Sequence, residues 1–178
     1  MTRFGRQPLC VALALWCASA STPSVADVKP VDALGRLVGT WKSAATFVKS
    51  DYSSTGPAHA TTACAWSSSR EFVICQQAVV FNGATSHDIS IYSYDPVAKR
   101  YKFHNIGLSN ASDSTIDVTQ KTITYPSNFK DHGHTVTMRT VNIWTSPELY
   151  YFRTEFSIDG GKHWTTMLSG SAHRVATK

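Results

Sequence analysis

Arg139 lies in a segment of otherwise largely apolar and hydroxylic residues and is the strongest candidate for binding a charged group. A hairpin turning at Ser146-Pro147 is expected to pair residues 135–144 with residues 149–158. This register places Arg139 opposite Thr154, on the face that carries aromatic side chains. A buried guanidinium must find a partner, and its planar fork matches a carboxylate. The sequence therefore predicts that Arg139 holds the anionic end of a ligand, unless an internal acid pairs with it or a register shift turns it outward.

Four aromatic residues are candidates for the wall and floor of a pocket around this arginine. They are Trp41, Tyr150, Phe152 and Phe156. Pockets for small molecules are lined mainly by apolar and aromatic side chains with a few polar groups that fix orientation. The predicted partner is therefore a small, largely apolar or amphipathic molecule.

A close histidine pair, His132 and His134, is the other arrangement that could do chemistry. Two residues apart on a strand, both rings could face one metal ion. The pair lies at a loop boundary, however, and no third ligand stands at a matching spacing. We therefore predict no metal site there.

The N-terminal segment has the organisation of a secretory signal peptide. Two arginines precede the apolar stretch 9–18, and small residues lead up to Ala26. The apolar stretch is too short to span a bilayer. Cleavage is expected after Ala26, with Ala20 as an earlier alternative, which leaves residues 27–178 as a single secreted or periplasmic domain.

The charge pattern argues against nucleic acid as a partner, and the residues before the N-terminal cysteines argue against a lipid anchor. The chain has 17 Lys+Arg and 12 Asp+Glu, and removing residues 1–26 takes away two arginines and no acid, so the net charge falls from +5 to +3. The remaining cations are scattered, with Lys99-Arg100 as the single adjacent pair, so no phosphate-binding stripe forms. Bulky residues precede both cysteines of the N-terminal segment, whereas lipid attachment requires a small one there.

Two cysteines remain after cleavage, Cys64 and Cys75, and both would reach an oxidising compartment. The residues between them have strand formers on both sides of a central Ser69-Arg70 turn. A hairpin with this turn brings the two sulfur atoms opposite each other. We predict a structural disulfide rather than a catalytic thiol pair, which would have C-x-x-C spacing.

Many short strands separated by tight turns define the expected fold. The chain is 42% hydrophobic and 16% charged, and serine and threonine make up nearly a quarter of it, a composition that favours strands and turns over helices. A short helix is expected at 30–37 and an irregular loop at 126–133. Strands are expected near 41–47, 60–67, 71–81, 86–94, 100–106, 114–119, 122–125, 135–144, 149–158 and 163–175. An all-β, antiparallel up-and-down barrel of nine or ten strands accounts for this pattern, since the turns are too short for sandwich crossovers.

Several motifs resemble known barrel families. The segment 37–41 is similar to the G-x-W opening of lipocalins and related calycins, in which a short helix leads into the first strand. The residues 94–96, Tyr101, 156–164 and 174–175 extend the likeness. Together they resemble a calycin-like, lipocalin-related family of small secreted bacterial proteins catalogued as a domain of unknown function. The resemblance covers essentially all of residues 27–178 and implies a barrel with an interior pocket, without naming a ligand.

Two alternatives remain beside the pocket. Nitrobindin-like calycins, which bind haem through a late histidine, resemble this chain in Gly39-Thr40-Trp41 and in the position of His173. They carry a longer glycine-rich motif where Lys42-Ser43-Ala44 stands here. The other alternative is a barrel filled by its own side chains that acts as an interaction module.

Motifs for catalysis are not found in the sequence. The segment 157–164 fits the S-x-D-x-G-x-x-W pattern of sialidase propellers, but it occurs once and is expected to shape a turn. There is no G-x-S-x-G elbow, phosphate loop, dinucleotide fingerprint or H-E-x-x-H motif. A spatial pair of carboxylates, such as Asp88 with Glu155, stays open. A binding function is therefore favoured over an enzymatic one.

Overall fold

Ten antiparallel strands and one short helix make up the computed structural model, which describes residues 29–107 and 110–176. The expected signal peptide, residues 1–26, lies outside the described residues. The helix is a 3-10 helix, η1, over Pro30–Leu37. The strands are β1 Gly39–Phe47, β2 Gly56–Trp66, β3 Phe72–Phe81, β4 Ala84–Asp95, β5 Arg100–Ile106, β6 Ala111–Val118, β7 Thr122–Asp131, β8 His134–Ser146, β9 Leu149–Ser157 and β10 Thr165–Arg174.

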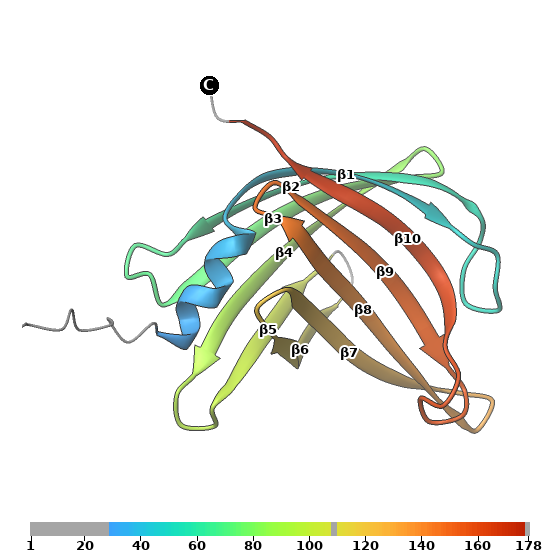
Figure 1. Ribbon diagram of the computed structural model, residues 1–178. Coiled ribbons are helices and arrows are strands. Elements are labelled where there is room, and N and C mark those ends of the chain that lie inside the picture. The colour runs from blue at the N-terminus through green and yellow to red at the C-terminus, as the bar shows by residue number, and fades with distance from the viewer. Residues whose placement is uncertain (1–28, 108–109, 177–178) are drawn as a thin grey trace, which may run out of the picture.

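Each strand pairs with its neighbours in sequence, and the first strand also pairs with the last, so the sheet closes into a barrel (Figure 1). β1 and β10 share seven registered residue pairs, from Trp41 with Arg174 to Phe47 with Leu168. Closure gives the first and last strands of the sheet a partner, so neither of them is an exposed edge that invites aggregation. The predicted all-β, up-and-down barrel is confirmed, with ten strands.

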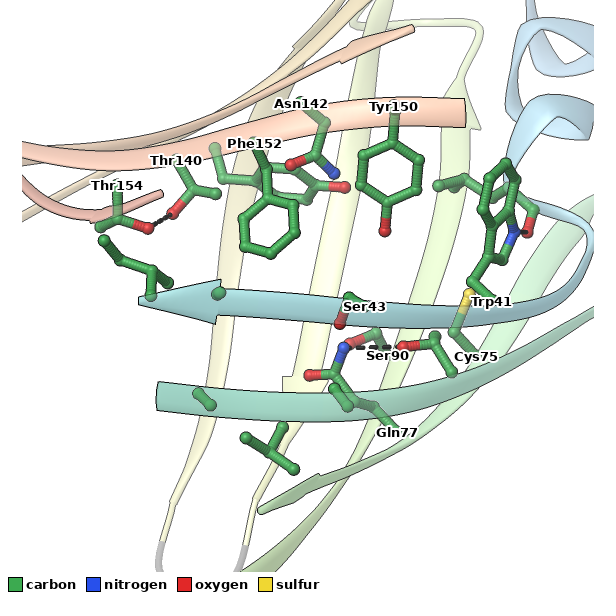
Figure 2. Close-up of a pocket in the computed structure, with 18 of the residues that line it drawn as sticks. Trp41, Ser43, Cys75, Gln77, Ser90, Thr140, Asn142, Tyr150, Phe152 and Thr154 are labelled. Carbon is green, nitrogen blue, oxygen red and sulfur yellow. Dashed lines mark hydrogen bonds between the residues drawn. The ribbon is translucent and has the colours of Figure 1, made fainter. Parts of the chain in front are cut away.

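Side chains alternate between the barrel interior and its outer surface, as the two-residue period of a strand requires. On β1, Trp41 is 2% exposed, whereas the adjacent Lys42 is exposed. The same alternation brings Ser43 from β1, Gln77 from β3 and Tyr150 from β9 to one interior space (Figure 2).

Helix η1 covers one end of the barrel (Figure 1). Leu34 and Leu37, three residues apart on one helix face, are buried in a core that also contains Trp41. The indole Nε1 of Trp41 donates a hydrogen bond to the carbonyl oxygen of Leu37 at 2.9 Å, which fixes the exit of the helix against the first strand. Across residues 29–107 and 110–176, no helix has the length and apolarity needed to cross a membrane.

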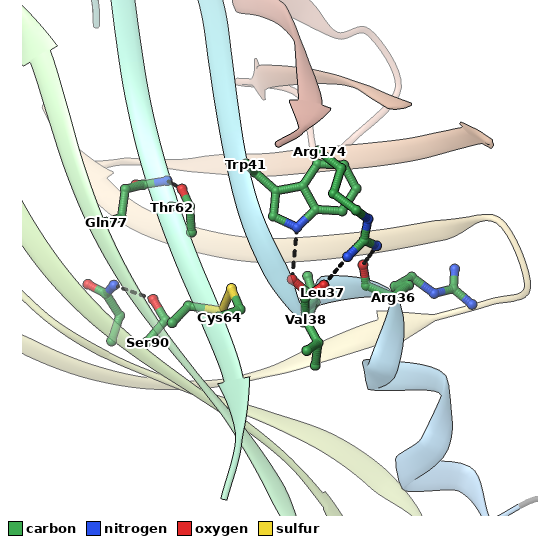
Figure 3. Close-up of a disulfide and its surroundings, with 11 residues drawn as sticks. Arg36, Leu37, Val38, Trp41, Thr62, Cys64, Gln77, Ser90 and Arg174 are labelled. Carbon is green, nitrogen blue, oxygen red and sulfur yellow. Dashed lines mark hydrogen bonds between the residues drawn. A yellow bond between two sulfur atoms is a disulfide. The ribbon is translucent and has the colours of Figure 1, made fainter. Parts of the chain in front are cut away.

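Arg174, near the end of β10, ties the last strand to this helix (Figure 3). Its guanidinium lies over the ring of Trp41, with Cζ 4.4 Å from the ring centroid. It donates to the carbonyl oxygens of Val38, Arg36 and Pro147. The charge is thus satisfied by carbonyl groups and an aromatic face at the closed end.

The predicted disulfide between Cys64 and Cys75 is confirmed (Figure 3). The two residues face each other across β2 and β3, with Cα atoms 4.0 Å apart. Arg70 has a positive φ of 57° in the turn between the strands, as expected for a tight turn. Both cysteines are buried and belong to the core next to η1.

A second, smaller core lies toward the other end of the barrel. It contains Val136, Phe156 and Met167, with Tyr52 packed against them from the loop between β1 and β2. The ring centroids of Tyr52 and Phe156 are 4.8 Å apart, and the Tyr52 hydroxyl donates to Asp131 at 3.1 Å. This loop therefore folds back onto the barrel wall.

The loop predicted at residues 126–133 is wrong over most of its length, because β7 continues to Asp131 and pairs with β8 throughout. This strand contains Pro126, which is registered with Arg139 of β8. The registered pairing of β7 with β6 ends at Thr124, so the strand is an edge beyond that residue. Proline is tolerated on an edge, where its missing N–H is not needed for the ladder.

Replacing both Cys64 and Cys75 with serine should lower the free energy of unfolding by about 3 kcal/mol, because the bridge restricts the unfolded chain. Urea denaturation followed by tryptophan fluorescence measures this loss. Adding a reductant to the native protein should cause a similar loss and should leave the double variant unchanged. An unfolding midpoint of the native protein that ignores reductant would contradict the stabilising role of the bridge.

Candidate functional site

A cavity of about 470 Å³ lies inside the barrel and is lined by η1 and nine of the strands (Figure 2). Its wall combines aromatic rings, small aliphatic residues, hydroxyl groups and carboxamides. The disulfide and Trp41 contribute to it on the side of η1. A volume of this size is within the range of pockets for small organic molecules.

Aromatic rings form one side of the cavity. Tyr150 and Phe152 project from β9. The ring centroid of Tyr150 lies 5.0 Å from that of Trp41 and 4.7 Å from that of Trp144. Trp144 and Trp41 therefore both pack against the Tyr150 ring, which fixes the shape of this wall.

Two small residues on β10 make room for these rings. Gly170 is registered with Phe152, and Ala172 with Tyr150. A Cβ on Gly170 would lie 2.7 Å from the Cζ of Phe152 and would collide with the carbonyl oxygen of Ala44. The Phe152 ring can take its position because this glycine has no side chain.

Uncharged polar side chains form much of the rest of the wall. The Nε2 of Gln77 donates to the Thr62 hydroxyl at 2.8 Å. The Nδ2 of Asn105 donates to the Ser90 hydroxyl at 3.0 Å. These bonds hold both carboxamides in defined orientations on β3 and β5, the two neighbours of β4.

The buried tyrosines stay protonated at neutral pH. Burial raises the pKa of Tyr150 to about 12. Burial likewise raises the pKa of Tyr92 above its ordinary value and that of Tyr125 well above it. Their hydroxyl groups are therefore neutral hydrogen-bonding groups in this part of the interior.

The structure brings three of the predicted pocket residues together. Trp41, Tyr150 and Phe152 all line the cavity. Phe156 also faces inward but belongs to the smaller core with Met167, outside the cavity lining.

Sequence reasoning missed the carboxamides of Gln77, Asn105 and Asn142, which also line the cavity. One of them, Gln77, could have been found from the predicted disulfide. Gln77 lies two residues after Cys75 on β3, so it shares the face of the sulfur atom. The sequence does not show that the disulfide faces the barrel interior, and without that fact Gln77 could not be placed in the cavity wall.

Arg139 lies on the outer face, and its predicted inward orientation is wrong. It pairs in register with Glu155, and its Nε donates to Oε2 of that residue at 2.8 Å. The Nε of Arg153 donates to Oε1 of Glu155 at 2.9 Å. The Arg139 guanidinium also lies over Trp164, with Cζ 3.9 Å from the ring centroid. Two arginines thus balance the charge of one carboxylate that is 8% exposed.

A β-bulge in β8 explains this orientation. The register shifts between Trp144 and Ser146, so Trp144 rather than Ile143 pairs with Tyr150. A one-residue offset exchanges the two faces of a strand. Arg139 is therefore turned outward.

His173 does not fit an axial haem ligand inside the barrel. It is exposed on β10 and pairs in register with Lys42, an outer-face residue of β1. The haem hypothesis is therefore corrected: the histidine that motivated it points away from the interior.

The segment 157–164 shapes the turn between β9 and β10, as predicted. The backbone N–H groups of Lys162 and His163 both donate to Oδ1 of Asp159, each at 3.0 Å. Gly160 and Gly161 have positive φ values of 72° and 90°. The hydrogen bonds to Asp159 hold the pKa of its carboxyl group well below the usual range. This turn positions Trp164 over Arg139.

The closed ten-strand barrel with an interior cavity is a calycin-like fold, and solved structures share it. The S-type phycobiliprotein lyase CPES from Guillardia theta is similar with a TM-score of 0.54 and 12% sequence identity, over 83% of this chain and 93% of that chain. Rv2717c from M. tuberculosis is similar with a TM-score of 0.56 and 15% identity, over 84% of this chain and 100% of that chain.

Sequence comparisons add no closer relationship. No protein-family model matches the chain, and no curated protein is significantly similar to it. The likeness to the two solved structures therefore shows the fold alone.

Arg139→Leu should lower the free energy of unfolding by about 1–3 kcal/mol, because it removes one of the two partners of a buried carboxylate. A double-mutant cycle with Glu155→Gln, measured by urea denaturation, should give a coupling energy of at least about 0.5 kcal/mol. Arg100→Leu, at an exposed arginine of β5, is the control and should change stability little. Additive effects of the two substitutions would contradict the pairing.

Proposed function

We propose that this protein binds a small, largely apolar or amphipathic molecule inside its barrel. The observation that carries the proposal is the cavity of about 470 Å³ next to the aromatic residues Trp41, Tyr150 and Phe152. Burial of an apolar ligand surface gains roughly 25 cal/mol per Å², so even a modest molecule would gain useful affinity here. The calycin-like fold shared with a protein described as a phycobiliprotein lyase is in keeping with this role.

The preorganised wall supports binding rather than a purely structural interior. Tyr150 is held between two tryptophans, and the Gln77 and Asn105 carboxamides are held by neighbouring hydroxyls. A wall fixed in advance lowers the ordering cost of association. The volume left between these groups argues against a barrel filled by its own side chains that serves as an interaction module.

We also propose that the protein is exported. In this proposal residues 1–26 are a signal peptide, residues 27–178 form one secreted or periplasmic domain, and the chain belongs to the calycin-like family of small secreted bacterial proteins. The Cys64–Cys75 disulfide supports an oxidising compartment. The absence of a third cysteine after residue 26 leaves this bridge as the natural pairing.

Binding can be tested with N-phenyl-1-naphthylamine, an uncharged probe whose fluorescence rises in apolar surroundings. The native protein should bind it, and Ala60→Phe should weaken binding at least about tenfold by filling the cavity. Ala63→Phe is the matched control, because Ala63 is exposed on the outer face of the same strand.

Circular dichroism and thermal melting verify that both variants keep the barrel. Equal probe binding by Ala60→Phe and Ala63→Phe would place the probe outside the cavity and contradict the proposal. So would a native protein that binds neither this probe nor an uncharged long-chain alcohol that could replace it.

Export can be tested by the intact mass of protein recovered from the periplasm or medium of an expressing bacterium. The expected mass corresponds to a chain that begins at Asp27 and is two hydrogen atoms lighter through the disulfide. Full-length protein retained in the cytoplasm would contradict both the cleavage and the export.

A further inference from the structure

We propose that the cavity selects electrically neutral ligands that carry hydroxyl, carbonyl or amide groups on an apolar skeleton. This inference rests on the proposed function, because it specifies which small molecules the barrel holds. It replaces the anionic ligand end expected from Arg139, which the structure places on the outer face.

Charged side chains are missing from the cavity wall. Among the described residues that line it there is no lysine, arginine, aspartate or glutamate. His59 contributes from the outward side of β2, where it is exposed and registered with the exposed Ala44. A ligand charge inside the barrel would therefore find no counter-charge on the wall.

The two charged residues nearest in register, Arg174 and Asp88, are not among the residues that line the cavity. Arg174, registered with Trp41, is held at the closed end by backbone carbonyls and by the Trp41 ring. Asp88 is registered with Gln77, but its carboxylate lies against Gly107, where an added Cβ would be 2.8 Å from Oδ1. The fold thus keeps both ions at the margins of the interior.

Desolvation then discriminates against charged ligands. A carboxylate or ammonium group that enters the cavity loses its hydration shell, and neutral dipoles replace only part of it. A neutral polar group loses much less and can regain it through one or two hydrogen bonds. The free-energy difference favours an alcohol, ketone or amide over an acid or amine of the same skeleton.

The wall offers hydrogen-bonding groups that suit such ligands. The Gln77 and Asn105 carboxamides each use one N–H on a neighbouring hydroxyl and retain a second N–H and an oxygen. The side chains of Asn142 and Tyr150 project into the same space from β8 and β9, and within the described part of the chain neither side chain makes a hydrogen bond (Figure 2). These groups can both donate and accept, as a neutral ligand with mixed polar atoms requires.

A pair of probes that differ by one charge tests the selection on the native protein. N-phenyl-1-naphthylamine is neutral, and 8-anilinonaphthalene-1-sulfonate has the same skeleton with one sulfonate. Fluorescence titrations should give an affinity at least about tenfold higher for the neutral probe. Displacement of the neutral probe by dodecanol, but not by dodecanoate at pH 7.5, should show the same preference.

The outcomes separate this inference from the proposed function. Comparable affinities for both probes, or a higher affinity for the sulfonate, would overturn the selection and leave small-molecule binding intact. Failure of both probes and of dodecanol to bind would overturn the proposed function and, with it, the selection.

Two adjacent glutamines on β3 provide a matched pair of variants. Gln77 faces the cavity, whereas Gln76 is exposed on the outer face. Gln77→Arg should raise the affinity for the sulfonate probe at least about tenfold by placing a cation in the wall, whereas Gln76→Arg adds the same charge outside and should not. Asn105→Lys serves as a second interior position if Gln77→Arg does not fold. Equal effects of interior and exterior cations would overturn the selection.

Discussion

The pairing of β1 with β10 is the constraint on which the rest of the molecule depends. Once the sheet closes, the direction of one side chain fixes that of its neighbours around the barrel, because registered partners share a face. Trp41 is registered with Thr62, and Thr62 with Gln77, so the inward direction of Trp41 also turns Thr62 and Gln77 inward. Arg174, registered with Trp41 on the other side, reaches the carbonyl oxygens of Arg36 and Val38 at the end of η1 in this register. The register between β1 and β10 therefore determines strand closure, the docking of the helix and the composition of the cavity wall together.

Much of the fold could be predicted from local patterns. The Cys64–Cys75 spacing around a central turn identified one hairpin, and the Gly39-Thr40-Trp41 segment identified the junction of helix and barrel. Alternation of apolar and polar residues located nearly every strand. The second half of β7 was expected to be a loop, yet it accommodates Pro126 because beyond Thr124 the strand is registered with β8 on one side and has no registered β6 partner on the other. That fact depends on tertiary structure rather than on the local sequence.

The site was less predictable, because it depends on which face of each strand turns inward. β8 carries apolar residues on both faces, with Val141 outward and Trp144 inward, so its pattern does not choose between them. The bulge next to Trp144 determines which face of β8 turns inward, and it places Arg139 on the outer face. Tyr150 and Phe152 were found because they lie two residues apart on β9 and share one face whatever the register of β8, and Trp41 was found from its place directly after the helix. The carboxamides were missed because an isolated glutamine or asparagine has the composition of a surface residue.

Gly170 fixes the position of one part of the cavity wall, whereas the wall formed by β1 and β2 can change in size. No side chain can be added there unless the β1 backbone at Ala44 moves, so the seat of the Phe152 ring is locked into the closure of the barrel. Ala45, Ala58 and Ala60 also face the cavity but can grow into open space. Substitutions along β1 and β2 could therefore change the size of the cavity one methyl group at a time. The wall that carries Phe152 would stay unchanged, so a lineage of such proteins would diverge in the shape of the cavity while keeping the same architecture.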